Sequence, residues 1–214
     1  AIGSLAAGVA HEIRNPLSSI KGFAVYFRQR LSGNKEDEET ADIIIAETER
    51  LNRVISQLLE FARPLTLKKE PTNMMDLVRH TIKLVEVEAR KSGVEMDVQG
   101  EERPMNAEID PDKVKQVLLN VFLNSLSAMT EGGRLSVRLE AQKESVEVTV
   151  SDTGAGIREN DLPRIFDPYF TSKPAGTGLG LAVVQKIMEA HGGAVKVESK
   201  EGHGTKVTLR FSNS

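Results

Sequence analysis

Hydrophobic residues recur every three or four positions along the part of the chain before Pro64, which is typical of amphipathic helices. The first stripe comprises Leu5, Val9, Ile13, Leu17 and Ile20. The second stripe comprises Ile44, Leu51, Val54, Leu58 and Phe61. The pattern predicts one helix from Ser4 to Leu31 and another that follows the acidic turn SGNKEDEE and ends at Ala62. Because a lone hairpin cannot bury both stripes, we expect a homodimer in which two hairpins form a four-helix bundle.

After Pro71 the pattern changes to a mixture of helical and alternating segments. Helices are expected at 74–93, 111–129 and 180–191, and strands at 94–100, 134–141, 145–152, 194–199 and 205–211. Helices and strands without strict alternation indicate an α+β sandwich, with the helices on one face of a mixed sheet. The predicted organisation is a helical hairpin over residues 1–65, a linker over 66–72 and a second domain over 73–214.

Composition excludes several classes of protein. With 39% hydrophobic and 28% charged residues, the chain is typical of an ordinary globular protein. A net charge of −3 argues against broad nucleic-acid binding, which needs a surplus of basic residues. The absence of cysteine rules out disulfides, thiolate metal sites and a cysteine nucleophile. No run approaches the roughly 20 apolar residues of a membrane helix, so we expect no membrane contact in this stretch.

One histidine of the first helix does not fit the apolar stripe. His11 lies two residues from both Val9 and Ile13, so at about 100° per residue it should point into solvent. Glu12 follows it directly, and Asn15, four residues on, returns to the same side of the helix. Pro16 then interrupts the hydrogen-bond pattern, either as a bend that eases rearrangement or as a tolerated static kink.

Two polar motifs in the second half have residue types suited to a nucleotide. Asn120 and Asn124 are neighbours on one helix face, where their amide oxygens could hold a hard cation beside phosphate oxygens. Asp152 closes a strand ahead of Gly154 and Gly156, and its carboxylate could accept a hydrogen bond from an exocyclic amine such as that of adenine. Taken singly, a solvated helix face and an ordinary turn explain these motifs equally well.

A glycine-rich loop leads into the last predicted helix. In GTGLGL, Gly176, Gly178 and Gly180 leave backbone N–H groups and a positive helix end to face an anion. The sequence matches neither the dinucleotide fingerprint nor a Walker motif, so this loop alone is weak evidence. The preceding segment IFDPYFTSKPA could form a lid that brings Lys173 near phosphates, and GHGT places Thr205 at the start of the last strand.

The order and spacing of these motifs resemble the ATP-binding domain shared by histidine kinases, gyrase, the chaperone Hsp90 and MutL, which has the Bergerat-type sandwich fold. HEIRNPL resembles the phosphoacceptor box of sensor histidine kinases. The stretches LAAGVAHEIRNPLSSIKGFA and AETERLNRVISQLLEFARP are similar to nitrogen-regulation and zinc-responsive sensor kinases. Since the chain begins without Met inside a helical pattern, we interpret it as the cytoplasmic core of such a kinase, with any inner-membrane anchor in a sensor region that precedes it.

The resemblance implies roles for the residues of the first helix. His11 would be phosphorylated by ATP, and Glu12 would accept the hydrogen bond of the Nδ1 proton, which raises the nucleophilicity of Nε2. The phosphoryl group would pass to an aspartate in the receiver domain of a response regulator, of the NtrC type on the narrower similarity. Asn15 would position a water that hydrolyses the regulator's phosphoaspartate.

The resemblance also assigns the nucleotide site. Asn124 would coordinate Mg²⁺ with Asn120 close to metal or phosphate, and Asp152 would bind adenine. The remaining predicted ATP-binding residues are Gly154, Gly156, Lys173, Gly176, Thr177, Gly178, Leu179, Gly180, Leu181 and Thr205. The ATPase relatives carry Glu at the position of Asn120, and an amide removes that general base for hydrolysis. Two alternative functions remain, namely a nucleotide-binding scaffold without kinase activity and a hydrolytic ATPase. The sequence also does not decide whether the ATP-binding domain phosphorylates His11 of its own chain or of the other chain.

Overall fold

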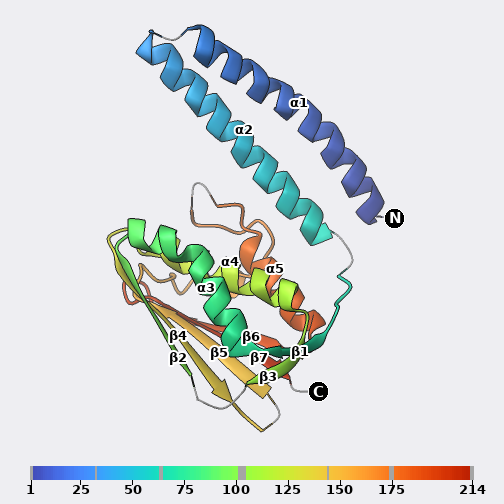
Figure 1. Ribbon diagram of the computed structural model, residues 1–214, viewed down its shortest axis with the longest axis vertical. Coiled ribbons are helices and arrows are strands. Elements are labelled where there is room, and N and C mark those ends of the chain that lie inside the picture. The colour runs from blue at the N-terminus through green and yellow to red at the C-terminus, as the bar shows by residue number, and fades with distance from the viewer. Residues whose placement is uncertain are drawn as a thin grey trace. The chain divides into compact units, whose positions relative to one another are not determined.

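The computed structural model describes residues 2–31, 33–62, 65–100, 105–143, 145–173 and 176–212. Side chains are described from Ile13 onward within these ranges, except Arg53, Gln57 and residues 59–62. The chain divides into two compact units, Ala1–Pro64 and Leu65–Ser214 (Figure 1). Among the described residues no helix is long and apolar enough to cross a membrane.

The first unit is a hairpin of two long helices. Helix α1 (Ile2–Arg30) continues past Pro16, and helix α2 (Lys35–Ala62) begins with three acidic residues that suit the positive end of a helix. The predicted bounds of both helices are therefore close to those observed. The strength of the periodic pattern explains the agreement, because long amphipathic segments are the most reliable elements to predict.

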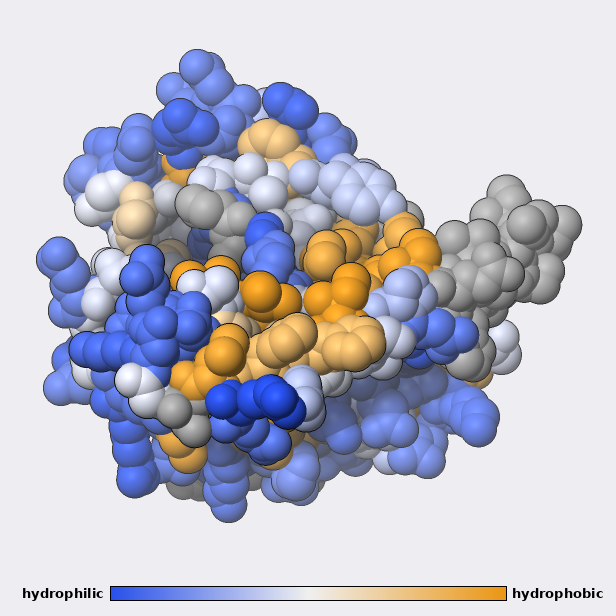
Figure 2. All heavy atoms as spheres, turned by 90° about the horizontal axis from the view of Figure 1, so that it is seen from above, coloured by the Kyte–Doolittle hydropathy of each residue, from blue (hydrophilic) through white to orange (hydrophobic). Residues whose placement is uncertain are grey.

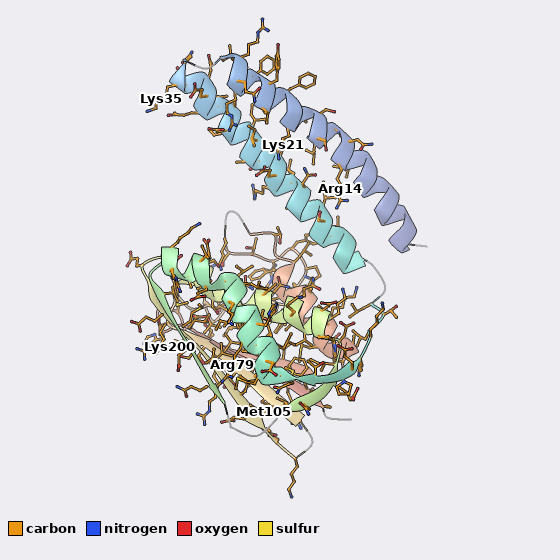
Figure 3. All side chains as sticks on the ribbon, viewed as in Figure 1. Arg14, Lys21, Lys35, Arg79, Met105 and Lys200 are labelled. Carbon is orange, nitrogen blue, oxygen red and sulfur yellow. The ribbon has the colours of Figure 1, made fainter. Side chains whose placement is uncertain are left out.

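The seam between α1 and α2 repeats every seven residues. Its buried side chains are Leu17 and Ala24 on α1, and Ala41, Thr48 and Ile55 on α2. Along one edge of this seam lies a ladder of polar contacts with the same seven-residue spacing, namely Arg14–Ser56, Lys21–Glu49 and Arg28–Asp42, each 2.8 Å long. Figure 3 labels Arg14 and Lys21, the α1 members of two of these contacts. The constant spacing fixes the antiparallel register of the hairpin.

The other edge of the seam carries apolar side chains that stay exposed. They are Ile13, Ile20 and Phe27 on α1, and Ile44, Leu51 and Leu58 on α2. We call these six residues the open stripe. Sequence analysis assigned most of them to the apolar helix faces, yet within one chain only the seam between the helices is covered. Figure 2 shows the stripe as a band of hydrophobic atoms flanked by hydrophilic ones.

The described part of the second unit contains five longer strands, two short strands, three α-helices and one short 3-10 helix, Leu162–Arg164. The helices are α3 (Met74–Lys91), α4 (Pro111–Ala128) and α5 (Gly180–Ala190). The large sheet comprises β2 (Val94–Gly100), β4 (Gly133–Ala141), β5 (Ser145–Asp152), β7 (Thr205–Ser212) and β6 (Ala194–Ser199), in that spatial order. β2 and β4 are parallel and the other neighbours are antiparallel, so the sheet is mixed as predicted.

All three helices lie against one face of this sheet (Figure 1). The alternation of the strands explains this arrangement, since Leu135, Val137 and Leu139 of β4 are buried whereas Arg134 and Arg138 are exposed. The buried strand positions meet buried positions of α4, among them Val117, Leu118, Val121 and Phe122. The predicted α+β sandwich with helices on one face is confirmed.

Sequence analysis missed a small second sheet. β1 (Glu70–Asn73) pairs antiparallel with β3 (Asn106–Ile109), and β1 begins inside the segment expected to be a linker. Each strand has only four residues, and β1 contains Pro71, which is unfavourable for a strand. The pairing therefore depends on tertiary contacts that local periodicity cannot reveal.

Candidate functional site

Helix α4 presents three site residues along one side. Asn120, Asn124 and Ala128 are spaced four residues apart, so their side chains follow one another on the same face. Asn120 is half-buried and Asn124 is exposed. Neither side-chain amide forms a hydrogen bond with any residue that the structure describes. Two amides without protein partners, side by side, are available to a ligand.

The start of helix α5 lies against these amides. A Cβ added to Gly180 would be 3.6 Å from Asn120 Oδ1 and 3.7 Å from Asn124 Nδ2. The N-cap residue of α5 is Leu179, which offers no side-chain acceptor to the first N–H groups of the helix. Those backbone donors and the positive helix end therefore face the same region as the two amides, and this combination favours an anion such as a phosphate.

Asp152 occupies the buried end of strand β5. Its Oδ1 accepts hydrogen bonds from the N–H groups of Gly154, at 3.0 Å, and Thr205, at 3.1 Å. Oδ2 has no hydrogen-bond partner among the described residues. These two hydrogen bonds hold the carboxylate of Asp152 in one orientation. Oδ2 is then available to accept a hydrogen bond from a ligand.

The turn after Asp152 is clamped between α4 and the loop before β7. Ala155 N–H donates to the Ala128 carbonyl at 3.0 Å, and a Cβ on Gly154 would approach that oxygen to 2.6 Å. Gly156 has φ +69°, and a Cβ there would lie 2.1 Å from the carbonyl oxygen of Lys200. Glycine is required at both positions, because any side chain would push this turn away from α4 or from the loop.

The end of β6 and the loop before β7 contribute residues that sequence analysis did not single out. Ser199 accepts the Ile157 N–H at 2.9 Å and lies 2.9 Å from the Thr205 hydroxyl. Gly204 has φ +88°, and a Cβ there would be 2.0 Å from the backbone oxygen of Asp152. GHGT marked the loop in the sequence, but nothing in the local pattern linked Ser199 to Ile157, which is 42 residues away.

Lys173 reaches the carboxyl-terminal half of α4 from the segment before the glycine loop. Its Nζ donates to the Asn124 carbonyl at 3.2 Å and to the Ser127 hydroxyl. Burial of the ammonium group lowers the pKa of Lys173, and the charge of Asp152 acts in the opposite direction. Lys173 is thus brought beside Asn124, and its proximity to phosphates stays a prediction.

The same segment contains a strained residue that the sequence did not reveal. Tyr169 is the one described non-glycine residue with a positive φ, +68°, and its N–H donates to the Gly178 carbonyl at 3.0 Å. Gly178 also has φ +68°, and a Cβ there would contact Tyr169 at 2.4 Å. Arg164 stacks over Phe170 at 4.6 Å from the ring centroid. These contacts tie the segment to the glycine loop.

The described residues offer amides rather than carboxylates to a metal. No group of three or more His, Cys, Asp or Glu that could hold a metal ion occurs among them. Asn120 and Asn124 therefore fit a hard cation that draws its remaining ligands from phosphate oxygens and water. Of the other predicted residues, Gly176 donates its N–H to the Lys173 carbonyl and the Thr177 hydroxyl accepts the Leu179 N–H, while Leu181 is half-buried in the first turn of α5.

The predicted phosphoacceptor lies partly outside the described residues. His11 and Glu12 belong to the helical backbone of α1, but their side chains are not described. Asn15 is exposed, as expected for a residue that acts on a partner.

Comparison with known proteins agrees with both halves of this description. The model of the His Kinase A (phospho-acceptor) domain matches residues 1–66, and that of the histidine kinase-, DNA gyrase B-, and HSP90-like ATPase matches residues 109–214. The catalytic domain of histidine kinase ThkA is 31% identical, with a TM-score of 0.64, over 68% of this chain and 96% of that domain. The chain belongs to the sensor histidine kinases.

Three further relatives align with nearly all of the 214 residues of this chain. ZraS of Salmonella typhimurium is 47% identical over 210 residues, which are 98% of this chain and 45% of ZraS. The structure of full-length ShkA with AMPPNP has a TM-score of 0.82 at 25% identity, over 100% of this chain and 47% of ShkA. ThkA in complex with the response regulator TrrA has a TM-score of 0.75 at 29% identity, over 100% of this chain and 62% of that one. The chain spans about half the length of the curated relatives it matches.

Proposed function

We propose that this chain is the catalytic core of a sensor histidine kinase that transfers the γ-phosphoryl group of ATP to His11. The arrangement around α4 carries the proposal. The unpartnered amides of Asn120 and Asn124 face the uncapped start of α5, and Asp152 is held near Ala128 on the same side of α4. From Asn120 to Ala128 the helix rises about 12 Å, which leaves room for a ribose between a phosphate end and a base end.

The residues take separate roles in this proposal. Asp152 Oδ2 accepts a hydrogen bond from the exocyclic amine of adenine, and the N–H groups at the start of α5 bind phosphate oxygens. Asn124, with Asn120 beside it, supplies amide oxygen to Mg²⁺, which when bound neutralises charge on the phosphates. Lys173 adds a positive charge beside Asn124. The amide at Asn120 provides no general base for water, so hydrolysis is disfavoured.

The phosphoryl group then moves by two balanced substitutions. The Nε2 lone pair of His11 attacks the γ-phosphorus, the bond to the β,γ-bridging oxygen breaks, and ADP leaves with the electron pair. Glu12 accepts the hydrogen bond of Nδ1–H and stabilises the cationic ring. A carboxylate oxygen of a response regulator aspartate, of the NtrC type in our proposal, then attacks the phosphorus, and the electron pair of the N–P bond returns to Nε2.

We further propose that the open stripe is the interface of a homodimer. Its three α1 and three α2 residues have the seven-residue spacing of coiled-coil positions and flank the seam on the side opposite the polar ladder. A second hairpin placed on this stripe completes a four-helix bundle and removes the six apolar side chains from water.

Radiolabelled phosphate transfer tests the main proposal. With γ-labelled ATP and Mg²⁺ the protein should acquire a label that is stable to base and labile to acid. His11→Ala should abolish the label, whereas His80→Ala, at an exposed histidine on α3, should retain it. Label that persists in His11→Ala would place the phosphosite elsewhere. Tight ATP binding without any label would favour the scaffold, and rapid phosphate release without a regulator would favour the ATPase.

Asn15 carries a second, separable activity in this proposal, the dephosphorylation of the regulator. Its side chain is exposed on α1, one turn after His11. Asn15→Ala should leave autophosphorylation largely intact and slow the loss of phosphate from the regulator. Equal loss of both activities would contradict this division of roles.

A further inference from the structure

Helices α4 and α5 run antiparallel and are joined at the end remote from the candidate nucleotide site. At the site, Gly180 of α5 meets Asn120 and Asn124 of α4. At the other end of α5, the backbone N–H of Asp110, the N-cap residue of α4, donates a hydrogen bond to Nε2 of His191, the C-cap residue of α5. The two contacts therefore lie at opposite ends of α5.

His191 is buried and makes two hydrogen bonds that fix its chemical form. Nε2 accepts the backbone N–H of Asp110 at 3.0 Å, and Nδ1 bonds the backbone carbonyl of Ile187 at 2.8 Å. Because a backbone N–H can only donate and a carbonyl can only accept, the ring must be neutral with its proton on Nδ1.

The surroundings of His191 oppose its protonation. Burial lowers the pKa of His191 and the nearby Lys69 ammonium lowers it further, while the hydrogen bond to Ile187 and the Asp110 carboxylate act in the opposite direction. Lys69 Nζ donates to the His191 carbonyl at 3.3 Å, and the Phe211 ring packs edge-on at 6.4 Å. The Asp110 carboxylate is itself occupied by the N–H groups of Lys68 and Lys113. If Nε2 of His191 were protonated, its N–H would point at the backbone N–H of Asp110, and the hydrogen bond between these two groups would be lost.

The geometry points to His191 as a positioning residue that sets the axial alignment of α5 against α4, and thereby the placement of the Gly180 backbone beside Asn120 and Asn124 for nucleotide binding. The inference rests on the proposed nucleotide site. What is new is that nucleotide affinity depends on the hydrogen-bond acceptor Nε2 of His191, which lies at the end of α5 remote from Gly180. A residue that only filled space would need the volume of the ring but not its lone pair.

Binding equilibria offer a test in the unmodified protein. If nucleotide binding requires the aligned helices, it favours the neutral ring, and by reciprocity AMPPNP with Mg²⁺ should lower the pKa of His191. The negative charge of the nucleotide acting through space would raise that pKa instead. Nitrogen NMR of the histidine rings, titrated with and without nucleotide, measures the direction and also reports the tautomer. A raised or unchanged pKa, or a proton on Nε2 at neutral pH, would overturn the inference.

A pair of variants tests the acceptor directly. His191→Leu keeps an apolar side chain but removes the acceptor, whereas His191→Gln can place an amide oxygen near the position of Nε2. Dissociation constants for a fluorescent ATP analogue should rise about tenfold in the Leu variant, equivalent to about 1.4 kcal/mol, and stay within about twofold in the Gln variant.

Val85→Ala, at a buried position of α3, is the control for general loss of stability. It should leave the dissociation constant near that of the unmodified protein. Equal weakening by Val85→Ala and His191→Leu, or no weakening by His191→Leu, would refute the positioning role. If His191→Leu does not fold, the NMR titration decides. Failure of the unmodified protein to bind the analogue would instead refute the proposed function.

Discussion

The two units of this chain bury their hydrophobic residues to very different degrees. The second unit, Leu65–Ser214, is called the catalytic unit below. It encloses large side chains between its helices and sheet, including Phe122, Leu118 and Leu209, each with no exposed surface. The described buried residues of the hairpin are only Leu17, Ala24, Ala41, Thr48 and Ile55. Thr48 even satisfies its hydroxyl on the carbonyls of Ile44 and Ile45 in its own helix. The catalytic unit therefore has a hydrophobic core that is complete within one chain, whereas the hairpin buries only its seam and leaves the open stripe exposed.

This difference suits the two roles we propose. A unit that must hold an adenine and a triphosphate in fixed positions benefits from dense packing around α4 and α5. A hairpin whose core is completed by a second chain can change its packing when its partner shifts, because small residues and a polar ladder resist sliding only weakly. Substitutions in each unit test this contrast.

Ile44→Asp should dissociate the proposed dimer. The substitution would bury one carboxylate from each chain in the interface, and each uncompensated charge costs several kcal/mol. Ile43→Asp is a matched control, because Ile43 is the adjacent isoleucine and is 69% exposed but lies off the open stripe. Sedimentation equilibrium should give monomers for Ile44→Asp and dimers for Ile43→Asp. Dimers in both variants would show that the open stripe is not the interface.

Phe122→Ala should destabilise the catalytic unit by about 3–5 kcal/mol, the usual cost of removing a buried phenylalanine. Leu123→Ala, at the next residue, should cost far less because Leu123 is 48% exposed. Urea denaturation followed by circular dichroism measures both, and dimer formation should persist in both variants. A similar loss from the two substitutions would contradict the view that the core of this unit is complete within one chain.

Much of this contrast could be predicted from the sequence. Seven-residue and alternating patterns are local, so the long helices and the five main strands were placed close to their observed positions. Asn120, Asn124, Asp152 and the glycines indicated a candidate site through their order and spacing together, since each motif taken singly has an ordinary structural explanation.

Other features depend on contacts between distant segments. Tyr169 takes a positive φ because Gly178 approaches it, and no residue near Tyr169 in the sequence signals this. The local sequence does not distinguish His191, because its partner Asp110 is 81 residues away. Leu17 is buried, but Ile13, Ile20, Ile44, Leu51 and Leu58 of the predicted stripes are exposed within one chain. The period of a helix shows which residues share a face but not what covers that face.

Gly204→Ala should weaken ATP binding at least tenfold. A methyl group there would lie 2.0 Å from the backbone oxygen of Asp152, so either the loop or the carboxylate that we propose to bind adenine must move. Gly202→Ala in the same loop separates this clash from the general strain of alanine at a positive φ. Gly202 has φ +76°, but its added methyl group meets nothing within 4 Å. Calorimetric titration with AMPPNP should show a much larger loss for Gly204→Ala, and equal losses would refute the close approach.

The polar ladder of the hairpin should contribute least. The Lys21–Glu49 pair is 2.8 Å long but its side chains are 41% and 47% exposed, so water screens its charges and its coupling energy should be about 0.2–1 kcal/mol. A double-mutant cycle with Lys21→Met and Glu49→Gln measures this coupling by thermal unfolding of the dimer. The coupling should shrink further in 1 M salt, where the Debye length is only about 3 Å. A coupling of several kcal/mol that salt does not change would mean that the ladder, rather than the buried seam between α1 and α2, holds the two helices in register.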